Sequence, residues 1–289
     1  MRLAFLGTPE AAVPSLRALV EAGHDVAMVI SQPDRRRGRG ALVTASPVKS
    51  AAEELGLIVA ADLAALDDVD VERAVVVAYG QLIPGTLLER IPMLNVHFSL
   101  LPRWRGAAPV ERAILAGDEV TGVGIISLET TLDTGPLHGE RRTSTRGKTA
   151  SALTAELAEM GAALLVDVLD DPQALASPRP QVGPSTYAAK LTPADFRLNA
   201  TMSPLEATRV VALERAFLTV QGRRLKVHSV DPSDAQLAAG TLRARGSEVV
   251  VGLTGGALAL GWVQPEGSRA MSAAAWWAGA RLGDGVAWQ

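Results

Sequence analysis

Hydrophobic residues in the first half of the chain form short runs separated by segments with a helical period. Residues 2–6 and 25–30 have the continuous apolar pattern of buried strands, and residues 11–22 between them have the pattern of an amphipathic helix. Two further buried strands are predicted at residues 74–78 and 93–97. Strands that alternate with helices are typical of a mostly parallel sheet, in which ligands bind beyond the carboxyl ends of the strands.

Two more helices are predicted before the pattern changes. Ser46 followed by Pro47 predicts the start of one, and a long helix is predicted over residues 149–169. The stretch 170–204 contains six prolines, at positions 172, 178, 180, 184, 193 and 204, and shows little periodicity. Beyond it, short strands separated by turn pairs such as Gln221-Gly222 predict a small β-barrel.

Two domains are therefore expected. The first, residues 1–189, is an α/β domain with a Rossmann-like, mostly parallel sheet. Residues 190–204 are the linker, and residues 205–289 form a smaller C-terminal β-barrel that resembles an OB-fold. The length of 289 residues agrees with this division, because domains usually have about 100–200 residues.

Composition excludes several classes of protein. Hydrophobic residues make up 48% of the chain and charged residues 20%, as in globular proteins. The chain has no cysteine, so disulfides, thiolate metal sites and cysteine nucleophiles are excluded. No apolar run approaches the roughly 18 residues of a membrane span, and Gly7 and Pro9 interrupt the apolar start. We expect a cytoplasmic protein without a membrane segment, and nothing demands more than a monomer.

The charge is unevenly distributed along the chain. Residues 1–189 carry 17 Lys and Arg against 23 Asp and Glu, whereas residues 203–289 carry 9 against 7. This weak basic bias is compatible with a nucleic-acid partner, but a solvated basic face would look the same. The first strand-to-helix turn, Gly7-Thr8-Pro9-Glu10, lacks the later glycines of a dinucleotide-binding loop, which disfavours a dehydrogenase.

Three polar residues suggest a chemical site. Asn95 and His97 are two positions apart in the predicted strand 93–97, so their side chains project from one side of the sheet. Acyl transfer to an amine passes through a tetrahedral oxyanion, which fixed donors of this kind stabilise. Asp133, in a turn with Gly135, could orient the histidine. From spacing alone, the three residues could instead be ordinary cap and turn residues.

Longer motifs carry a resemblance to a known family. They are NVHFSLLPRWRGAAPV from position 95, then TGVGI and LDTGP, with MRLAFLGTPE at the start and GALALGWVQPEGSRAMSA near the end. Over nearly its whole length the chain resembles folate-dependent formyltransferases. Its opening and closing motifs resemble those of the methionyl-tRNA formyltransferases in particular.

The resemblance implies an activity and a set of residues. It implies that the chain transfers the formyl group of 10-formyltetrahydrofolate to the α-amino group of methionyl initiator tRNA, for translation initiation, without a metal. It assigns catalysis to Asn95, His97 and Asp133, with Asp133 holding and charging His97. It assigns the lining of the folate site to a short segment, Ser99, Leu100, Leu101 and Pro102.

An arginine-rich loop follows the second predicted strand. Arginine suits phosphate contact, although such a loop is often only exposed. With the resemblance, it is expected to bind the tRNA acceptor stem through Arg35, Arg36, Arg37 and Arg39. The sequence departs from the family pattern at residues 41–42 and 211–217. The resemblance therefore does not define which residues contact the tRNA in these two segments.

Two rival functions remain open at this point. The same chemistry could act on a small amine such as an amino sugar, and binding without catalysis would make the chain a folate- or RNA-binding module. The other histidines, His24, His138 and His228, lack a matching context and are expected to be structural or at the surface.

Overall fold

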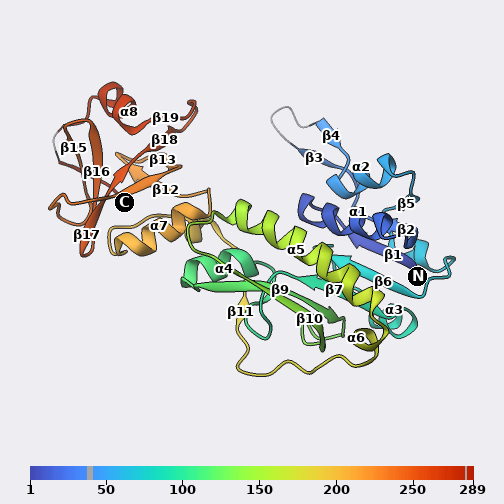
Figure 1. The fold of residues 1–289 in the computed structure, drawn as a ribbon. Coiled ribbons are helices and arrows are strands. Elements are labelled where there is room, and N and C mark those ends of the chain that lie inside the picture. The colour runs from blue at the N-terminus through green and yellow to red at the C-terminus, as the bar shows by residue number, and fades with distance from the viewer. Residues whose placement is uncertain (38–41, 284) are drawn as a thin grey trace. The chain divides into compact units, whose positions relative to one another are not determined.

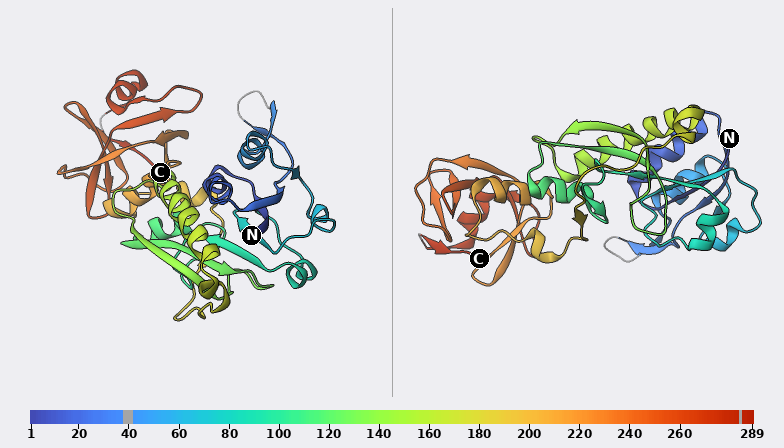
Figure 2. Two further views of the ribbon diagram at one scale, coloured as in Figure 1. Left: turned by 45° about the vertical axis from the view of Figure 1, so that its right-hand side comes forward. Right: turned by 90° about the horizontal axis from the view of Figure 1, so that it is seen from below.

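The computed structural model describes residues 1–37, 42–283 and 285–289, which form two compact units (Figures 1 and 2). The first unit comprises Met1–Val110, Glu119–Arg146 and Ala152–Ala189. The second comprises Glu111–Asp118, Gly147–Ser151 and Lys190–Gln289. No helix in the described part of the chain is long and apolar enough to cross a membrane.

The first unit is built on a seven-stranded sheet with the order β10-β9-β7-β6-β1-β2-β5. Its strands are β1 (Arg2–Gly7), β2 (Asp25–Ile30), β5 (Val59–Ala60), β6 (Arg73–Val77), β7 (Met93–His97), β9 (Val120–Ser127) and β10 (Leu137–Ser144). The five strands from β7 to β5 are parallel, whereas β9 and β10 are antiparallel. The expected mostly parallel α/β sheet is thus confirmed.

Helices connect these strands along the chain. They are η1 (Glu10–Ala12), α1 (Val13–Glu21), α2 (Pro47–Glu54), η2 (Leu63–Leu66), α3 (Gly85–Arg90), α4 (Pro109–Ala116), α5 (Ala150–Asp170) and α6 (Pro172–Ala176). One of them, α4, lies mostly in the second unit. Figure 1 shows α5 along one face of the sheet, where a Cβ on Gly161 would lie 2.7 Å from the Val96 side chain. The opposite face carries an apolar cluster that includes Leu66 of η2, Leu87 of α3 and Met93 of β7.

Local signals explain the helix starts. The Ser46 hydroxyl accepts a hydrogen bond from the Lys49 amide at 3.0 Å, and Pro47 occupies the first turn, as the sequence predicts for α2. The segment predicted as one helix over residues 11–22 divides into the 3-10 turn η1 and the helix α1. Two short strand pairs complete the region: β3 (Arg35–Arg37) with β4 (Leu42–Thr44), and β8 (Arg105–Gly106) with β11 (Tyr187–Ala188).

The second unit contains two antiparallel sheets around one apolar core. One sheet has the order β12-β13-β18-β19 and the other β14-β17-β16-β15-β20. The strands are β12 (Phe217–Val220), β13 (Arg223–Val227), β14 (Val230–Ser233), β15 (Thr241–Arg245), β16 (Glu248–Leu253), β17 (Gly256–Leu260), β18 (Trp262–Pro265), β19 (Met271–Ser272) and β20 (Val286–Ala287). Thr219 and Gln289 exchange backbone hydrogen bonds, and Thr241 pairs with Ala287, so the C-terminal segment contacts both sheets.

Segments with few periodic signals also have structure here. In the second unit, η3 (Pro193–Phe196) is followed by Leu198, which belongs to the apolar core, and by α7 (Pro204–Ala212). The helix α8 (Ala273–Ala280) packs Trp276 and Trp277 against the same core. Residues 190–204 therefore pack within the second unit.

Candidate active site

The strand β7 brings Asn95 and His97 to one side of the sheet. Because side chains alternate along a strand, both share the face of Met93, which lies in the apolar cluster described above. The face therefore changes from apolar to polar at the last positions of the strand. His97 is 6% exposed, whereas Asn95 is half-buried.

The imidazole of His97 faces an acceptor at each ring nitrogen. Its Nε2 lies 2.9 Å from the carbonyl oxygen of Trp104, and its Nδ1 lies 3.7 Å from Oδ2 of Asp133. The first contact is a hydrogen bond and the second an ion-pair distance. The protonated imidazolium has two N–H donors, and the neutral ring has one. Each ring nitrogen of His97 therefore has an acceptor within 4 Å.

Asp133 reaches His97 through a returning loop. Because β9 is antiparallel to β7, it ends beside Leu94, at the amino end of β7. The loop 128–136 then carries Asp133 back, and its backbone adopts a φ of 52°. Aspartate and asparagine adopt this conformation more readily than most other residues with a side chain. Here the Gly106 amide donates to Oδ2 of Asp133 at 2.8 Å.

The loop after His97 is held by a distant segment. Trp104 also has a left-handed φ, of 62°. Its amide donates to the Thr186 hydroxyl at 2.8 Å, and the Arg105 amide donates to the Thr186 carbonyl at 2.9 Å. Sequence reasoning missed Thr186 as part of this site. Its role depends on a contact between residues far apart in the chain.

Asn95 differs from its neighbours in its hydrogen bonds. No side-chain hydrogen bond to Asn95 occurs in the part of the chain that the structure describes. Its carboxamide has two N–H donors. Because the side chain is half-buried, two residues before His97 and on the same face, these donors can serve a ligand.

The residues predicted to line a folate site are mostly buried. Ser99 is 0% exposed and donates its hydroxyl to the Arg103 carbonyl at 2.6 Å. Leu101 packs in a small cluster with Ile126 and Leu137. Pro102 is buried and Leu100 half-buried. Contact of this segment with a ligand stays a prediction.

The predicted arginine loop is described only in part. Arg35, Arg36 and Arg37 form the backbone of β3, paired with β4. Arg39 lies outside the described residues. Its role and that of the other three arginines stay predictions.

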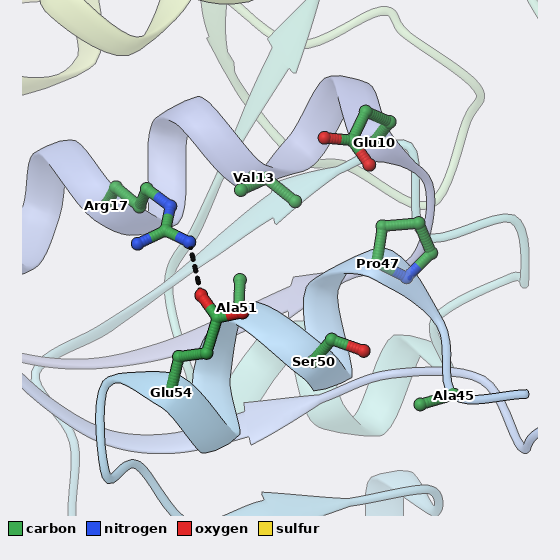
Figure 3. Close-up of a pocket in the computed structure, with 8 residues that line it drawn as sticks. All are labelled: Glu10, Val13, Arg17, Ala45, Pro47, Ser50, Ala51 and Glu54. Atoms are coloured by element: carbon green, nitrogen blue, oxygen red, sulfur yellow. Dashed lines mark hydrogen bonds and ion pairs between the residues drawn. The ribbon is translucent and has the colours of Figure 1, made fainter.

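A separate cavity of about 330 Å³ lies between α1 and α2 (Figure 3). Its rim carries the exposed ion pair of Arg17 with Glu54, 2.6 Å apart. Asn95, His97 and Asp133 are not among its lining residues. The convergence of polar groups at the end of β7, rather than this cavity, marks the candidate site.

His138 has a structural environment. Its Nε2 lies 2.8 Å from the Ser127 hydroxyl and its Nδ1 lies 2.9 Å from the Ala174 carbonyl. Burial lowers the pKa of this imidazole, against the opposing effect of the Ala174 carbonyl.

In the residues that the structure describes, no group of three or more His, Asp or Glu side chains has an arrangement suited to a metal ion.

Comparisons with known proteins cover nearly the whole chain. Residues 1–169 match the formyl transferase family, and residues 190–281 match the formyl transferase C-terminal domain. The methionyl-tRNA formyltransferase of Acidothermus cellulolyticus is 43% identical over 99% of each chain. That of Thermobifida fusca is 41% identical over 99% of this chain and 98% of its own.

Solved structures share the fold. An N-formyltransferase from Helicobacter canadensis, in complex with folinic acid and dTDP-3-aminofucose, has a TM-score of 0.70 and 15% identity over 91% of this chain and 98% of its own. HypX from Aquifex aeolicus, in complex with tetrahydrofolic acid, has a TM-score of 0.61 and 18% identity over 96% of this chain and 47% of its own. The chain is a formyl-transferring enzyme and belongs to the methionyl-tRNA formyltransferase family.

Proposed function

We propose that this enzyme transfers the formyl group of 10-formyltetrahydrofolate to the α-amino group of methionyl initiator tRNA. The observation that carries the chemistry is the buried contact of His97 with Asp133, 3.7 Å apart, at the carboxyl end of β7. The acceptor is inferred from relatives of this name that match both units of the chain.

In the proposed mechanism, the neutral α-amine attacks the formyl carbon. A new C–N bond forms, and the carbonyl electrons move onto oxygen to give a tetrahedral oxyanion. The carboxamide of Asn95 donates to this oxygen, and the positive charge of His97 stabilises it. The bond from carbon to folate N10 then breaks, N10 takes up a proton, and the attacking nitrogen loses one.

Asp133 acts on His97 in this scheme. Its carboxylate faces Nδ1, while the Trp104 carbonyl accepts from Nε2. Together they fix the plane of the ring. Asn95 is the group whose donors are available to the oxyanion. The segment Ser99–Pro102 follows His97 directly, and we propose that it lines the folate site.

The tRNA contacts are proposed for two regions. The loop with Arg35, Arg36, Arg37 and Arg39 would contact the acceptor stem. The C-terminal domain, residues 205–289, would contact the tRNA body, with residues 190–204 connecting it to the catalytic domain, 1–189. In its favour, β13 exposes Arg223 and Arg224.

The test is transfer of labelled formyl from 10-formyltetrahydrofolate. Acceptors are methionyl initiator tRNA, uncharged tRNA and small amines such as an amino sugar. Label on methionyl-tRNA alone supports the proposal. Label only on a small amine keeps the chemistry but overturns the acceptor, and folate binding without transfer to any acceptor overturns catalysis.

A further inference from the structure

Gln181 contacts both loops that surround His97. It lies in the proline-rich stretch between α6 and β11, within the first unit, and is half-buried. Its Nε2 donates to the carbonyl oxygens of Asp133 and Gly135, each at 2.8 Å. Its Oε1 accepts from Nε of Arg105 at 3.1 Å and from NH2 of Arg105 at 2.6 Å.

These contacts use the full capacity of the side chain. A carboxamide has two N–H donors and two acceptor lone pairs, and all four have partners here. A surface glutamine that merely covers a loop has no reason to be saturated in this way, because water competes for its groups. Gln181 therefore fixes the separation of Arg105 from the Asp133 turn.

That separation decides the geometry at His97. Arg105 stands between Trp104, whose carbonyl accepts from His97, and Gly106, whose amide donates to the Asp133 carboxylate. Asp133 itself has a left-handed backbone, with φ of 52°. Gln181 binds the carbonyl of that same residue.

We propose that Gln181 is a positioning residue for formyl transfer, which holds the Asp133 carboxylate against His97 by joining the two loops. The inference rests on the proposed function. Gln181 does not contact the reacting atoms in this scheme, and it acts through Asp133.

Two substitutions separate the contacts. Gln181→Glu keeps an oxygen acceptor for Arg105 but removes both donors and sets a carboxylate against two carbonyl oxygens. Gln181→Met has a similar length and removes all four hydrogen bonds. Gln173 in α6 provides matched controls, Gln173→Glu and Gln173→Met, because it is exposed and, in the described structure, its hydrogen bonds are made by its backbone amide and carbonyl and not by its side chain.

The measurements are kcat, KM for each substrate and the pH profile of kcat, all per folded enzyme. A displacement of about 1 Å at a reacting centre can lower a rate roughly 10²-fold. We expect both Gln181 variants to lose about 10²-fold in kcat with KM changed less than about 3-fold, and the pH profile to shift. The Gln173 variants should match the wild type.

A double-mutant cycle with Asp133→Asn keeps the test decisive if Gln181→Met does not fold. If Gln181 acts through Asp133, Gln181→Glu should lower kcat less than about 3-fold in the Asp133→Asn background. Full additivity, or Gln181 variants with wild-type kcat and pH profile, would overturn the inference. A wild-type enzyme that formylates no acceptor would instead overturn the proposed function, so the two failures are distinguishable.

Discussion

Replacing Asp133 by Asn removes one charge from the site and little else. The amide oxygen of Asn can still accept the hydrogen bond from the Gly106 amide, which the carboxylate accepts at 2.8 Å. Asparagine also tolerates the left-handed conformation that Asp133 adopts, with φ of 52°. The variant should therefore fold with a thermal midpoint close to that of the wild type.

The size of the effect follows from the distance. Two unit charges about 4 Å apart attract each other by about 4 kcal/mol at the effective dielectric constant near a protein surface. Asp133 Oδ2 lies 3.7 Å from His97 Nδ1, with both side chains less than 10% exposed, at 7% and 6%. Since about 1.4 kcal/mol corresponds to tenfold in rate, the loss in kcat is expected between about 10²- and 10³-fold.

The assay is initial-rate formyl transfer with the concentrations of folate and methionyl-tRNA varied up to saturation, which gives kcat and the KM for each substrate. Circular dichroism and thermal melting of the same preparation establish that the variant is folded. KM for both substrates should change little, because the charge acts on the transition state. A folded Asp133→Asn enzyme with kcat within about 3-fold of the wild type would refute the role given to this ion pair.

Three further predictions follow. Gly106→Ala should destabilise the first unit by about 1–3 kcal/mol and lower kcat, because its Cβ would lie 2.8 Å from the Ala188 carbonyl at a φ of +120°. Gly23→Ala, with φ +80° and open space, is the control in the same melting and rate assays, and equal effects would contradict the steric account. The pKa of His138 is lowered below 6.5, and burial is the largest cause. In acid the unfolded chain therefore binds more protons than the folded protein. The contribution of His138 to stability should therefore be complete above pH 6.5 and fall as the pH drops toward the folded pKa. In denaturant titrations at several pH values, His138→Gln should flatten this dependence of the unfolding free energy on pH. An unchanged dependence in the variant would argue against a role for His138. Arg39→Ala should raise KM for tRNA and flatten its salt dependence while folate binding is retained, and an unaltered salt dependence in filter binding would count against phosphate contact.

Local patterns predicted much of the first unit. The strand Met93–His97 has the predicted bounds, because an apolar run that ends in a polar pair is read from neighbouring residues alone. The start of α2 was likewise predictable, since Ser46 and Pro47 act within one turn. Side-chain alternation in β7 placed Asn95 and His97 on one face.

The remainder of the site depends on contacts between distant segments. The antiparallel direction of β9, which makes Asp133 return through a left-handed turn, has no periodic signal in the sequence. Gln181 and Thr186 lie in a proline-rich stretch that predicts little regular structure, yet both bind the loops around His97. Such partners become visible only when the chain is folded, because their hydrogen bonds join residues that are far apart along it.

Single-turnover transfer by His97→Ala tests the central claim, that the polar cluster at the end of β7 carries formyl transfer to methionyl-tRNA. His97 is 6% exposed and its loss leaves the Trp104 carbonyl without that donor, which costs about 1–3 kcal/mol of stability. The rate is therefore expressed per folded enzyme. We expect formylmethionyl-tRNA to form on the wild type and at least about 10²-fold more slowly on folded His97→Ala, since removal of one oxyanion-stabilising group has an effect of that order. Formation of the same product at a rate within about 3-fold of the wild type would contradict the account.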